Sequence, residues 1–358
     1  MSGYEYGNAR LRAMKSRLLS RRELEQLAAA GSIRGLIAAL ARTTYRRSVE
    51  AALARASGME CIAEALRHDL VNTLGRVRQF YSGSAGEMVR LALRTYDVDN
   101  LKAILRGLSQ HLPAGEILSA LLPVGELSPN TLAELARAPG PRAAIDLLAT
   151  TRSPFAQPLL RLRSERPGAD PMVMELALDR WHFREARERL EDLRNGGQVM
   201  AGALDLEIDL ANLLIVLRFV ESPIPRHLIR QRLAADDLRV LFLGPGRLTF
   251  ELLEQAATQE TLEAGVDILA GTPYEVPLRA GLLAYSQSNR LSEFEAQLRR
   301  FRLRRLHEWI VKDPLGMGVV LGFTALKVSE VANIRRVAQG VSLGWRPELI
   351  RQALETVS

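Results

Sequence analysis

The 358-residue sequence predicts an all-α protein. Its apolar residues are mostly Leu and Ala, and aromatic residues make up only 5% of the chain, a composition that favours helix over sheet. Apolar residues recur every three or four positions along most of the sequence, which is the spacing of one buried helix face. Capping side chains stand before several of these stretches. We therefore expect helix in about 65–75% of the residues, roughly twice the average for globular proteins.

The predicted helices follow one another with short breaks. In the first half, the apolar spacing covers Arg10–Leu19, Glu23–Leu40, Arg46–Ala54, Met59–Phe80 and Ala85–Gly107. In the second half, it covers Met174–Leu193, Met200–Val220, Leu248–Ala257, Leu278–Ile310 and Leu315–Gly340. Strand-like alternation is limited to Leu238–Leu243, a run that fits a helix equally well. Gly- and Pro-rich breaks at Ser164–Pro171 and Gly244–Gly246 are candidate boundary regions.

The composition is that of a soluble globular chain, with 47% hydrophobic and 25% charged residues. Its length suits two or three domains. The single cysteine, Cys61, excludes a disulfide within the chain and fits a reducing compartment. The longest apolar run, Gly316–Leu326, is shorter than the roughly 20 residues of a bilayer span and is followed by Lys327. We therefore expect no membrane-spanning segment.

Three segments of the sequence align with one another without gaps: Leu19–Tyr45, Leu127–Ser153 and Leu248–Tyr274. A helix-capping residue takes the second position in each copy: Ser20, Ser128 and Thr249. The copies start roughly 110–120 residues apart, which is too far for the units of a solenoid. They predict three homologous helical domains at residues 1–122, 123–243 and 244–358, with the N-terminal segment a candidate to pack with the last domain.

A second repeated motif places an acid three residues before an asparagine. Its three copies are Asp97 with Asn100, Asp209 with Asn212, and Glu330 with Asn333. Residues three apart share one helix face, and an asparagine in an apolar stripe costs stability unless its amide is hydrogen-bonded. We expect each asparagine to be a structural residue that bonds a neighbouring helix or the acid. A direct role in partner binding is the alternative.

The net charge of +7 and the isoelectric point near 9.9 indicate a basic surface. Five arginines fall in one predicted helical stretch: Arg299, Arg300, Arg302, Arg304 and Arg305. Such a run suits an acidic protein partner or anionic lipid, or it forms a solvated face with its aliphatic stems packed down. By contrast, the sequence has no phosphate-binding GxxxxGK[ST] loop, no HExxH motif and no GxSxG elbow. We expect no cofactor, no metal site and no catalytic activity.

Three motifs resemble the C-subunit family of V-type and A-type ATPases (ATP synthases), whose eukaryotic relative is the d subunit of the V-ATPase. The first is Tyr6–Met14, and the second is Tyr96–Gly107. The third is Asp313–Gly316 followed by Lys327, Glu330, Asn333 and Arg335. The resemblance covers essentially the whole chain. It departs from a regular repeat at Gln339, where the other two copies have arginine.

This resemblance implies three similar helical domains in a pseudo-threefold, funnel-like arrangement. It also implies a non-catalytic rotor subunit that couples the central stalk to the membrane proteolipid ring and transmits torque for ion transport linked to ATP hydrolysis or synthesis. The implied partners are the D-type and F-type stalk subunits and the proteolipid ring, with one copy of this chain per complex. The implied location is the cytoplasmic face of the membrane, with contact to anionic lipid as a further option.

Two other classes of protein fit parts of the sequence. A basic helical repeat scaffold that binds nucleic acid would explain the isoelectric point and would bind in a strongly salt-dependent way. However, the basic residues do not recur in register with the repeats, and aromatic residues are few for base stacking. An α-helical enzyme would need polar residues converging between domains, whereas the recurrent positions are almost all apolar or capping. We therefore expect no nucleic-acid partner.

Overall fold

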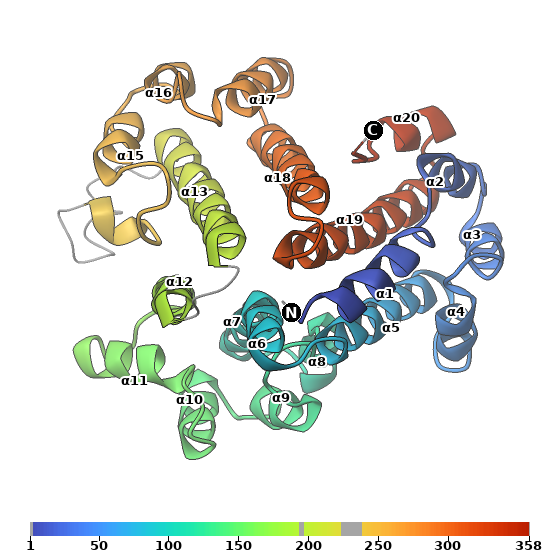
Figure 1. Ribbon diagram of the computed structural model, residues 1–358, viewed down its shortest axis with the longest axis horizontal. Helices are drawn as coiled ribbons and strands as arrows, with labels where there is room; N and C mark the ends of the chain where they lie inside the picture. Colours follow the sequence, from blue (N-terminus) through green and yellow to red (C-terminus); the bar gives the residue numbers. More distant parts are fainter. Residues whose placement is uncertain (1–2, 193–196, 223–237, 358) are drawn as a thin grey trace. The chain divides into compact units, whose positions relative to one another are not determined.

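A computed structural model describes residues 3–192, 197–222 and 238–357 of the chain. Helices make up 75% of these residues, and no strand occurs among them (Figure 1). The prediction of an all-α protein is therefore confirmed. The one candidate strand, Leu238–Leu243, instead contains a short 3₁₀ helix, η1 (Leu238–Leu241).

The chain forms two compact units, which we describe separately. Unit 1 comprises Met1–Asp97, Leu118–Pro129 and Leu303–Ser358, and unit 2 comprises Val98–Ile117 and Asn130–Arg302. Unit 1 thus combines the beginning and the end of the sequence. The division into three homologous domains stays a prediction.

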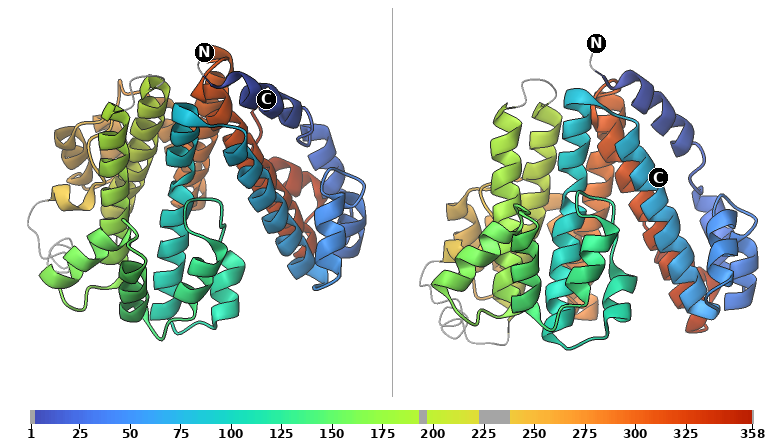
Figure 2. Two further views of the ribbon diagram at one scale, coloured as in Figure 1. Left: turned by 60° about the horizontal axis from the view of Figure 1, so that its bottom comes forward. Right: turned by 90° about the horizontal axis from the view of Figure 1, so that it is seen from below.

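Unit 1 is built around two long helices that run side by side, α5 (Gly58–Gln79) and α19 (Met317–Ser342) (Figure 2). The shorter helices of this unit are α1 (Glu5–Lys15), α2 (Arg21–Ala28), α3 (Ile33–Leu40), α4 (Arg46–Leu53), α6 (Gly83–Leu93) and α20 (Pro347–Gln352). Parts of α7 (Thr95–Ser109), α8 (Ala114–Ala120) and α18 (Ser292–Lys312) also belong to it.

Helix α19 is the core helix of unit 1. Among the described residues, it is the one helix that is long and apolar enough to cross a membrane by length and composition. In the sequence, we considered only the shorter apolar run Gly316–Leu326 and expected no such helix. However, 67% of its most apolar stretch is buried inside the fold, and it packs against α1, α2, α5 and α6. It also buries Lys327, Glu330 and Asn333. These features are those of a core helix that carries a polar cluster.

Unit 2 also pairs long helices, α12 (Pro171–Asp192) with α13 (Gly197–Glu221). Short helices connect and flank them: α9 (Pro129–Ala136), α10 (Pro141–Thr150), α11 (Ala156–Glu165), α15 (Phe250–Ala257), α16 (Leu262–Ile268) and α17 (Glu275–Ser288). The remainders of α7, α8 and α18 complete this unit. The predicted stretch Met174–Leu193 corresponds to α12, although Leu193 lies outside the described residues.

Some of the helical stretches predicted from the sequence consist of two separate helices in the structure. The stretch Glu23–Leu40 divides into α2 and α3 at Gly31, which has a φ of 68°. The stretch Leu278–Ile310 divides at Asn289, which caps α17 in the left-handed conformation. Glycine and asparagine adopt this conformation most easily, so these residues allow the chain to turn between helices where the apolar spacing continues.

The repeated capping residues Ser20 and Thr249 accept the expected hydrogen bond. The Ser20 hydroxyl accepts from the Glu23 amide, and the Glu23 carboxylate accepts from the Ser20 amide, which completes a capping box. The Thr249 hydroxyl accepts from the Leu252 amide at the start of α15. Ser128 directly precedes Pro129, the first residue of α9.

Candidate functional site: three acid-to-linker closures

The three repeated acids accept hydrogen bonds from the backbone just before the three repeated helix caps. Asp97 accepts from the Leu127 amide at 3.0 Å, and Asp209 accepts from the Leu248 amide at 3.1 Å. Glu330 accepts from the Leu19 amide at 2.6 Å. We call these contacts closure one, closure two and closure three, in that order. Each acid binds the copy that follows it, and the last binds the first, so the three closures form a cycle along the sequence.

In closures one and two, the acid also binds the amide one residue earlier. The Glu126 amide donates to Asp97 at 2.6 Å, and the Arg247 amide donates to Asp209 at 3.1 Å. All three acids are buried. Burying a carboxylate costs free energy unless its oxygens accept hydrogen bonds. The backbone amides just before the helix starts donate these hydrogen bonds. The acids therefore hold linkers in place.

Glycine makes the close approach in closures one and two possible. Gly125 and Gly246 each stand two residues before the bound leucine, and a Cβ atom on either would overlap the carboxylate of Asp97 or Asp209. The same position in closure three is Arg17, and the acid there is glutamate rather than aspartate. The extra methylene of Glu330 allows it to reach a linker that carries a side chain. Sequence reasoning misses these two glycines, although their spacing from the repeats is visible in the sequence.

The repeated asparagines Asn212 and Asn333 bind the backbone of connecting segments. Asn212 donates to the Gly244 carbonyl at 3.0 Å and accepts from the Leu243 amide at 2.9 Å. Asn333 binds both backbone groups of Glu355 in the same reciprocal way, at 2.8 and 2.9 Å. The expected partners were a neighbouring helix or the acid. The side-chain amides of Asn212 and Asn333 bind connecting segments instead, because backbone groups outside helices lack the internal partners that helical groups have. Asn100 is also buried.

Tyrosine hydroxyls complete closures two and three. Tyr274 donates to Asp209 at 2.8 Å, and Tyr45 donates to Glu330 at 2.7 Å. The two tyrosines align in the sequence repeat, where the middle copy has Ser153. Burial raises the pKa of Tyr45 well above its ordinary value, and the charges of Glu330 and Asp69 raise it further. The hydroxyl therefore stays protonated and donates.

Closure three also contains a buried charge cluster. The Lys327 ammonium lies 2.6 Å from Glu330, 2.7 Å from Asp69 and 2.9 Å from the Tyr45 hydroxyl. Only 6% of the Lys327 side chain and 3% of the Glu330 side chain are exposed to solvent. The ammonium also lies 4.3 Å from the centre of the Tyr45 ring. These contacts join α19, α5 and the start of α4, so the cluster ties three elements of unit 1 together.

We expect Asp97 to make the stability of the protein fall as the pH rises through 6. Burial raises the pKa of Asp97 to about 6, from an ordinary value of 3.8, against the lowering effect of its two backbone hydrogen bonds. At pH values between the ordinary pKa of 3.8 and the folded-state pKa of about 6, the folded state binds more protons than the unfolded state. The free energy of unfolding therefore decreases as the pH rises through this range. The loss between pH 4 and pH 7 should be on the order of 2–3 kcal/mol.

The measurement is urea unfolding of the wild type and of Asp97→Asn at several pH values between 4 and 7. The wild-type stability should fall relative to that of the variant, which has no carboxyl at this position. A difference that stays constant or grows across this range would contradict the assignment.

Replacing Asn212 by alanine should destabilise the protein by about 2–3 kcal/mol, because the Leu243 amide is buried and both linker groups lose their partner. The matched control is Asn72→Ala, since Asn72 is exposed on α5 and its side chain lies within hydrogen-bond distance of the His68 ring. We expect the control to stay within about 0.5 kcal/mol of the wild type in urea unfolding. Equal losses from both variants would argue against a specific role for closure two.

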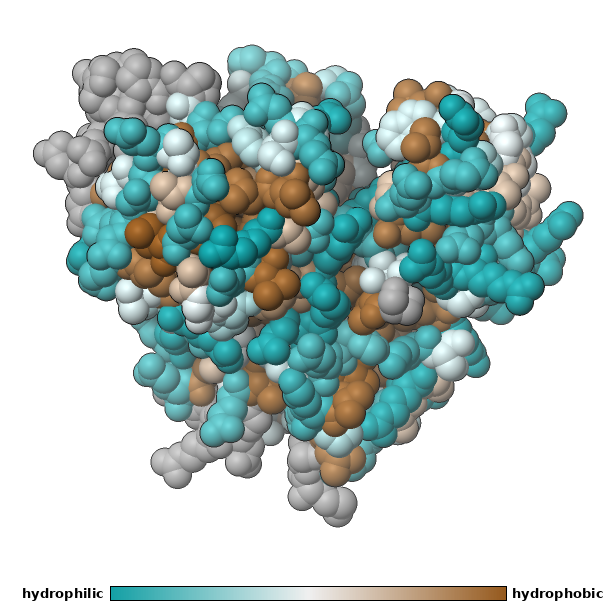
Figure 3. Space-filling model, turned by 90° about the horizontal axis from the view of Figure 1, so that it is seen from above, coloured by the Kyte–Doolittle hydropathy of each residue, from teal (hydrophilic) through white to brown (hydrophobic). Residues whose placement is uncertain are grey.

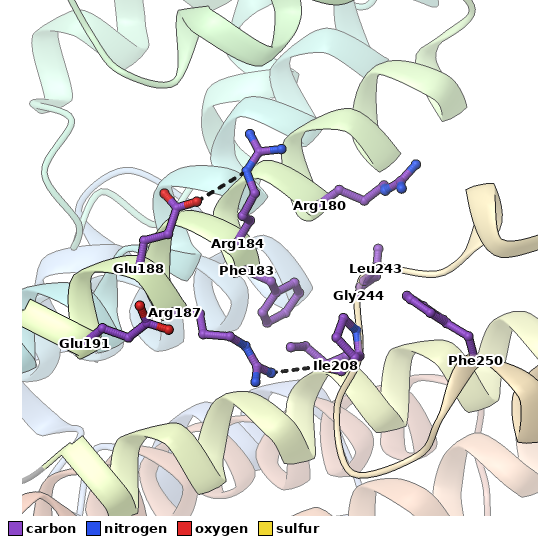
Figure 4. Close-up of a pocket in the computed structure, with 11 residues that line it drawn as sticks. Arg180, Phe183, Arg184, Arg187, Glu188, Glu191, Ile208, Leu243, Gly244 and Phe250 are labelled. Carbon is purple, nitrogen blue, oxygen red and sulfur yellow. Dashed lines mark hydrogen bonds and ion pairs between the residues drawn. The ribbon is translucent and has the colours of Figure 1, made fainter.

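A cavity of about 320 Å³ lies beside closure two in unit 2 (Figure 4). Its lining combines apolar and charged side chains, which include Phe183, Ile208, Leu243, Phe250, the arginines Arg180, Arg184 and Arg187, and the acids Glu188 and Glu191. Figure 4 shows the three arginines on one helix, α12, with Arg187 turned toward the linker. Arg187 lies 2.8 Å from both the Pro245 carbonyl and the Asp205 carboxylate. This arginine therefore braces the linker that closure two holds.

The predicted arginine run lies on α18 and is partly neutralised within the protein. Arg299, Arg302 and Arg305 form ion pairs with Glu295, Glu207 and Glu308, at 3.8, 2.6 and 3.3 Å respectively. Arg300 and Arg304 complete the run. The five residues therefore do not form one continuous free basic face. Elsewhere in the described part of the chain, no three His, Cys, Asp or Glu side chains gather where they could hold a metal ion.

Comparison with known proteins connects this architecture to one family. The family model for the ATP synthase (C/AC39) subunit matches residues 7–353. The C subunit of the A-type ATP synthase of Methanocaldococcus jannaschii is 23% identical over 355 residues, which cover 99% of this chain and 86% of the relative. The corresponding A-type protein of Methanosarcina barkeri is 24% identical, with 99% and 94% covered. The C subunit of the V-type ATP synthase of Deinococcus radiodurans is 25% identical, with 98% and 91% covered. Because the family model spans nearly the whole sequence, the chain belongs to the ATP synthase (C/AC39) subunit family.

Proposed function

We propose that this chain is the non-catalytic rotor subunit that couples the central stalk of a V/A-type rotary ATPase to the membrane proteolipid ring. Its membership of the family makes it an accessory subunit of a rotary ATPase complex. The single observation that carries the finer role is the cycle of three closures, in which every repeated buried acid is used to hold a linker.

The closures support three homologous domains at residues 1–122, 123–243 and 244–358. Each acid binds the segment before the next cap, as expected of three similar domains that follow one another in a pseudo-threefold, funnel-like arrangement. A torque-transmitting part must resist deformation between its two ends. Packed helices whose connections are tied by buried hydrogen bonds supply this stiffness, because dense interiors transmit strain.

The same contacts favour a structural role over a catalytic one. Catalytic carboxylates must reach a substrate, whereas Asp97, Asp209 and Glu330 are buried and accept hydrogen bonds from the protein's own backbone. We infer that ATP hydrolysis or synthesis and ion translocation take place in other subunits.

The proposed partners are the D-type and F-type stalk subunits and the proteolipid ring, at the cytoplasmic face of the membrane and with one copy per complex. Candidate contact points are large apolar side chains that the protein leaves exposed. Val276 and Leu283 on α17 are 74% and 67% exposed, and Val311 and Leu315 near the turn between α18 and α19 are 77% and 65% exposed. Figure 3 shows apolar patches between hydrophilic side chains on one face of the molecule. Exposed apolar patches of this kind suit protein partners.

The test is association in the native membrane. The tagged chain is purified in mild detergent, and its partners are identified by mass spectrometry. We expect the stalk subunits and the proteolipid to be recovered together with it. Recovery of neither, with nucleic acid bound in a salt-sensitive way, would favour the basic scaffold instead.

A further inference from the structure

Closure three differs from closure two in which segments of the chain provide the bound backbone groups. In closure two, a single linker provides the groups bound by Asn212 and by Asp209, so the acid and the asparagine anchor one continuous segment at two points. In closure three, Glu330 binds Leu19, whereas Asn333 binds Glu355, which lies far away in the sequence. The segment that follows α20 therefore occupies in closure three the position that Leu243 and Gly244 occupy in closure two.

This segment is held by side chains of α19. The Glu355 amide donates to Asn333, and the Glu355 carbonyl accepts from Asn333 at 2.8 Å and from Ser329 at 3.1 Å. The Glu355 carboxylate lies 2.8 Å from Arg336. Leu354 and Glu355 are each only 8% exposed. One residue thus uses its amide, its carbonyl and its side chain, which is how a groove recognises an extended peptide.

A cavity of about 350 Å³ continues from these contacts within unit 1. Thr356 and Val357 line it on one side, and apolar residues from α2, its preceding segment and α19 line the rest: Leu18, Leu19, Leu24 and Leu326. Glu330 and Asn333 also line it. The groove therefore extends from the asparagine contact to the acid of the same closure and offers apolar surface to the residues after Glu355.

We propose that residues 353–357 are a detachable strap, a peptide ligand that this groove of unit 1 binds in place of a continuous linker. On α19, the side chains of Asn333, Ser329 and Arg336 bind the strap, whereas the Glu330 carboxylate binds Leu19. Closure three can release this strap while Leu19 stays bound, whereas closure two cannot release half of its linker independently. The chemistry of the groove selects an extended segment in which an acidic residue follows an apolar one, as in Leu354 and Glu355.

Amide hydrogen exchange of the full-length chain tests this directly. The Glu355 amide should exchange at least about tenfold faster than the Leu243 amide, because strap release is a local opening. Asn333→Ala should accelerate exchange in residues 353–357 and leave residues 238–248 unchanged, and Asn212→Ala should do the reverse. If Glu355 exchanges as slowly as the core amides of α19, the strap does not detach and the proposal is wrong.

Peptide binding gives a second, independent readout. A chain that ends at Gln352 should stay folded and bind a fluorescent peptide of residues 353–358, and Asn333→Ala in the same chain should weaken this binding at least about tenfold. Asn72→Ala is the matched control and should leave binding unchanged. A shortened chain that is unfolded at 25 °C, or that is folded and does not bind the peptide, would contradict a detachable strap.

Discussion

Replacing Gly246 by alanine should destabilise the protein by about 2–4 kcal/mol, through overpacking and the loss of hydrogen bonds in closure two. A Cβ atom at this position would lie 2.7 Å from the Asp209 Cγ and 3.0 Å from the Asp205 carbonyl oxygen. Neither neighbour can move cheaply. Asp209 is fully buried and fixed by the Leu248 amide and the Tyr274 hydroxyl, and the carbonyl belongs to the backbone of α13.

Gly75 provides the matched control for this substitution. It lies within α5, and an added Cβ atom would meet nothing within 4 Å. Gly75→Ala should therefore stabilise the protein by about 0.5–1 kcal/mol, since alanine is the better helix former. Urea unfolding of both variants gives the comparison. If Gly246→Ala is as stable as the wild type, the tight approach of the linker to Asp209 is not needed for folding.

Glu330→Ala should destabilise the protein by about 3–5 kcal/mol. The change removes the acceptor of the Leu19 amide and of the Tyr45 hydroxyl, both of which are buried. It also leaves the Lys327 ammonium, which is 6% exposed, with Asp69 as its one remaining acidic partner in the cluster. Each buried donor that loses its acceptor costs about 1–3 kcal/mol, and the loss of the buried Lys327–Glu330 ion pair adds to this cost.

Two further variants separate the buried charge from other effects of this mutation. Glu308→Ala removes an acid that pairs with Lys312 on the exposed side of α18 and should cost at most about 1 kcal/mol. The double mutant Lys327→Met with Glu330→Gln should lose less stability than the sum of the two single mutants, because both substitutions remove the same buried ion pair. Additive losses in this double mutant would mean that Lys327 and Glu330 are not energetically coupled.

The sequence was sufficient to predict the all-α class, because apolar spacing and capping residues such as Ser20 and Thr249 mark helices locally. It also identified the three acids and three asparagines as a repeated set. Helix boundaries were less predictable, since Gly31 and Asn289 divide stretches whose apolar spacing continues across them. A residue that adopts a left-handed conformation leaves no trace in that spacing.

The partners of the repeated residues were not predictable from periodicity. Spacing shows which face of a helix is buried, but it does not show which backbone groups of a distant linker lack a partner. The pairing of Asp209 with Leu248 and of Glu330 with Leu19 therefore became visible only in the structure. One signal of the pairing is present in the sequence. The two copies that have aspartate as the repeated acid have glycine in the linker, whereas the copy that has glutamate has Arg17 at the glycine position.

The most direct test of the coupling role is to measure ATP hydrolysis and ATP-driven ion uptake in the same reconstituted vesicles, with complexes that contain or lack this chain. If the chain joins the stalk to the ring, complexes without it should lose ion uptake while their catalytic subunits still hydrolyse ATP, and adding the purified chain should restore uptake. Ion uptake that is unchanged without the chain would contradict the coupling role.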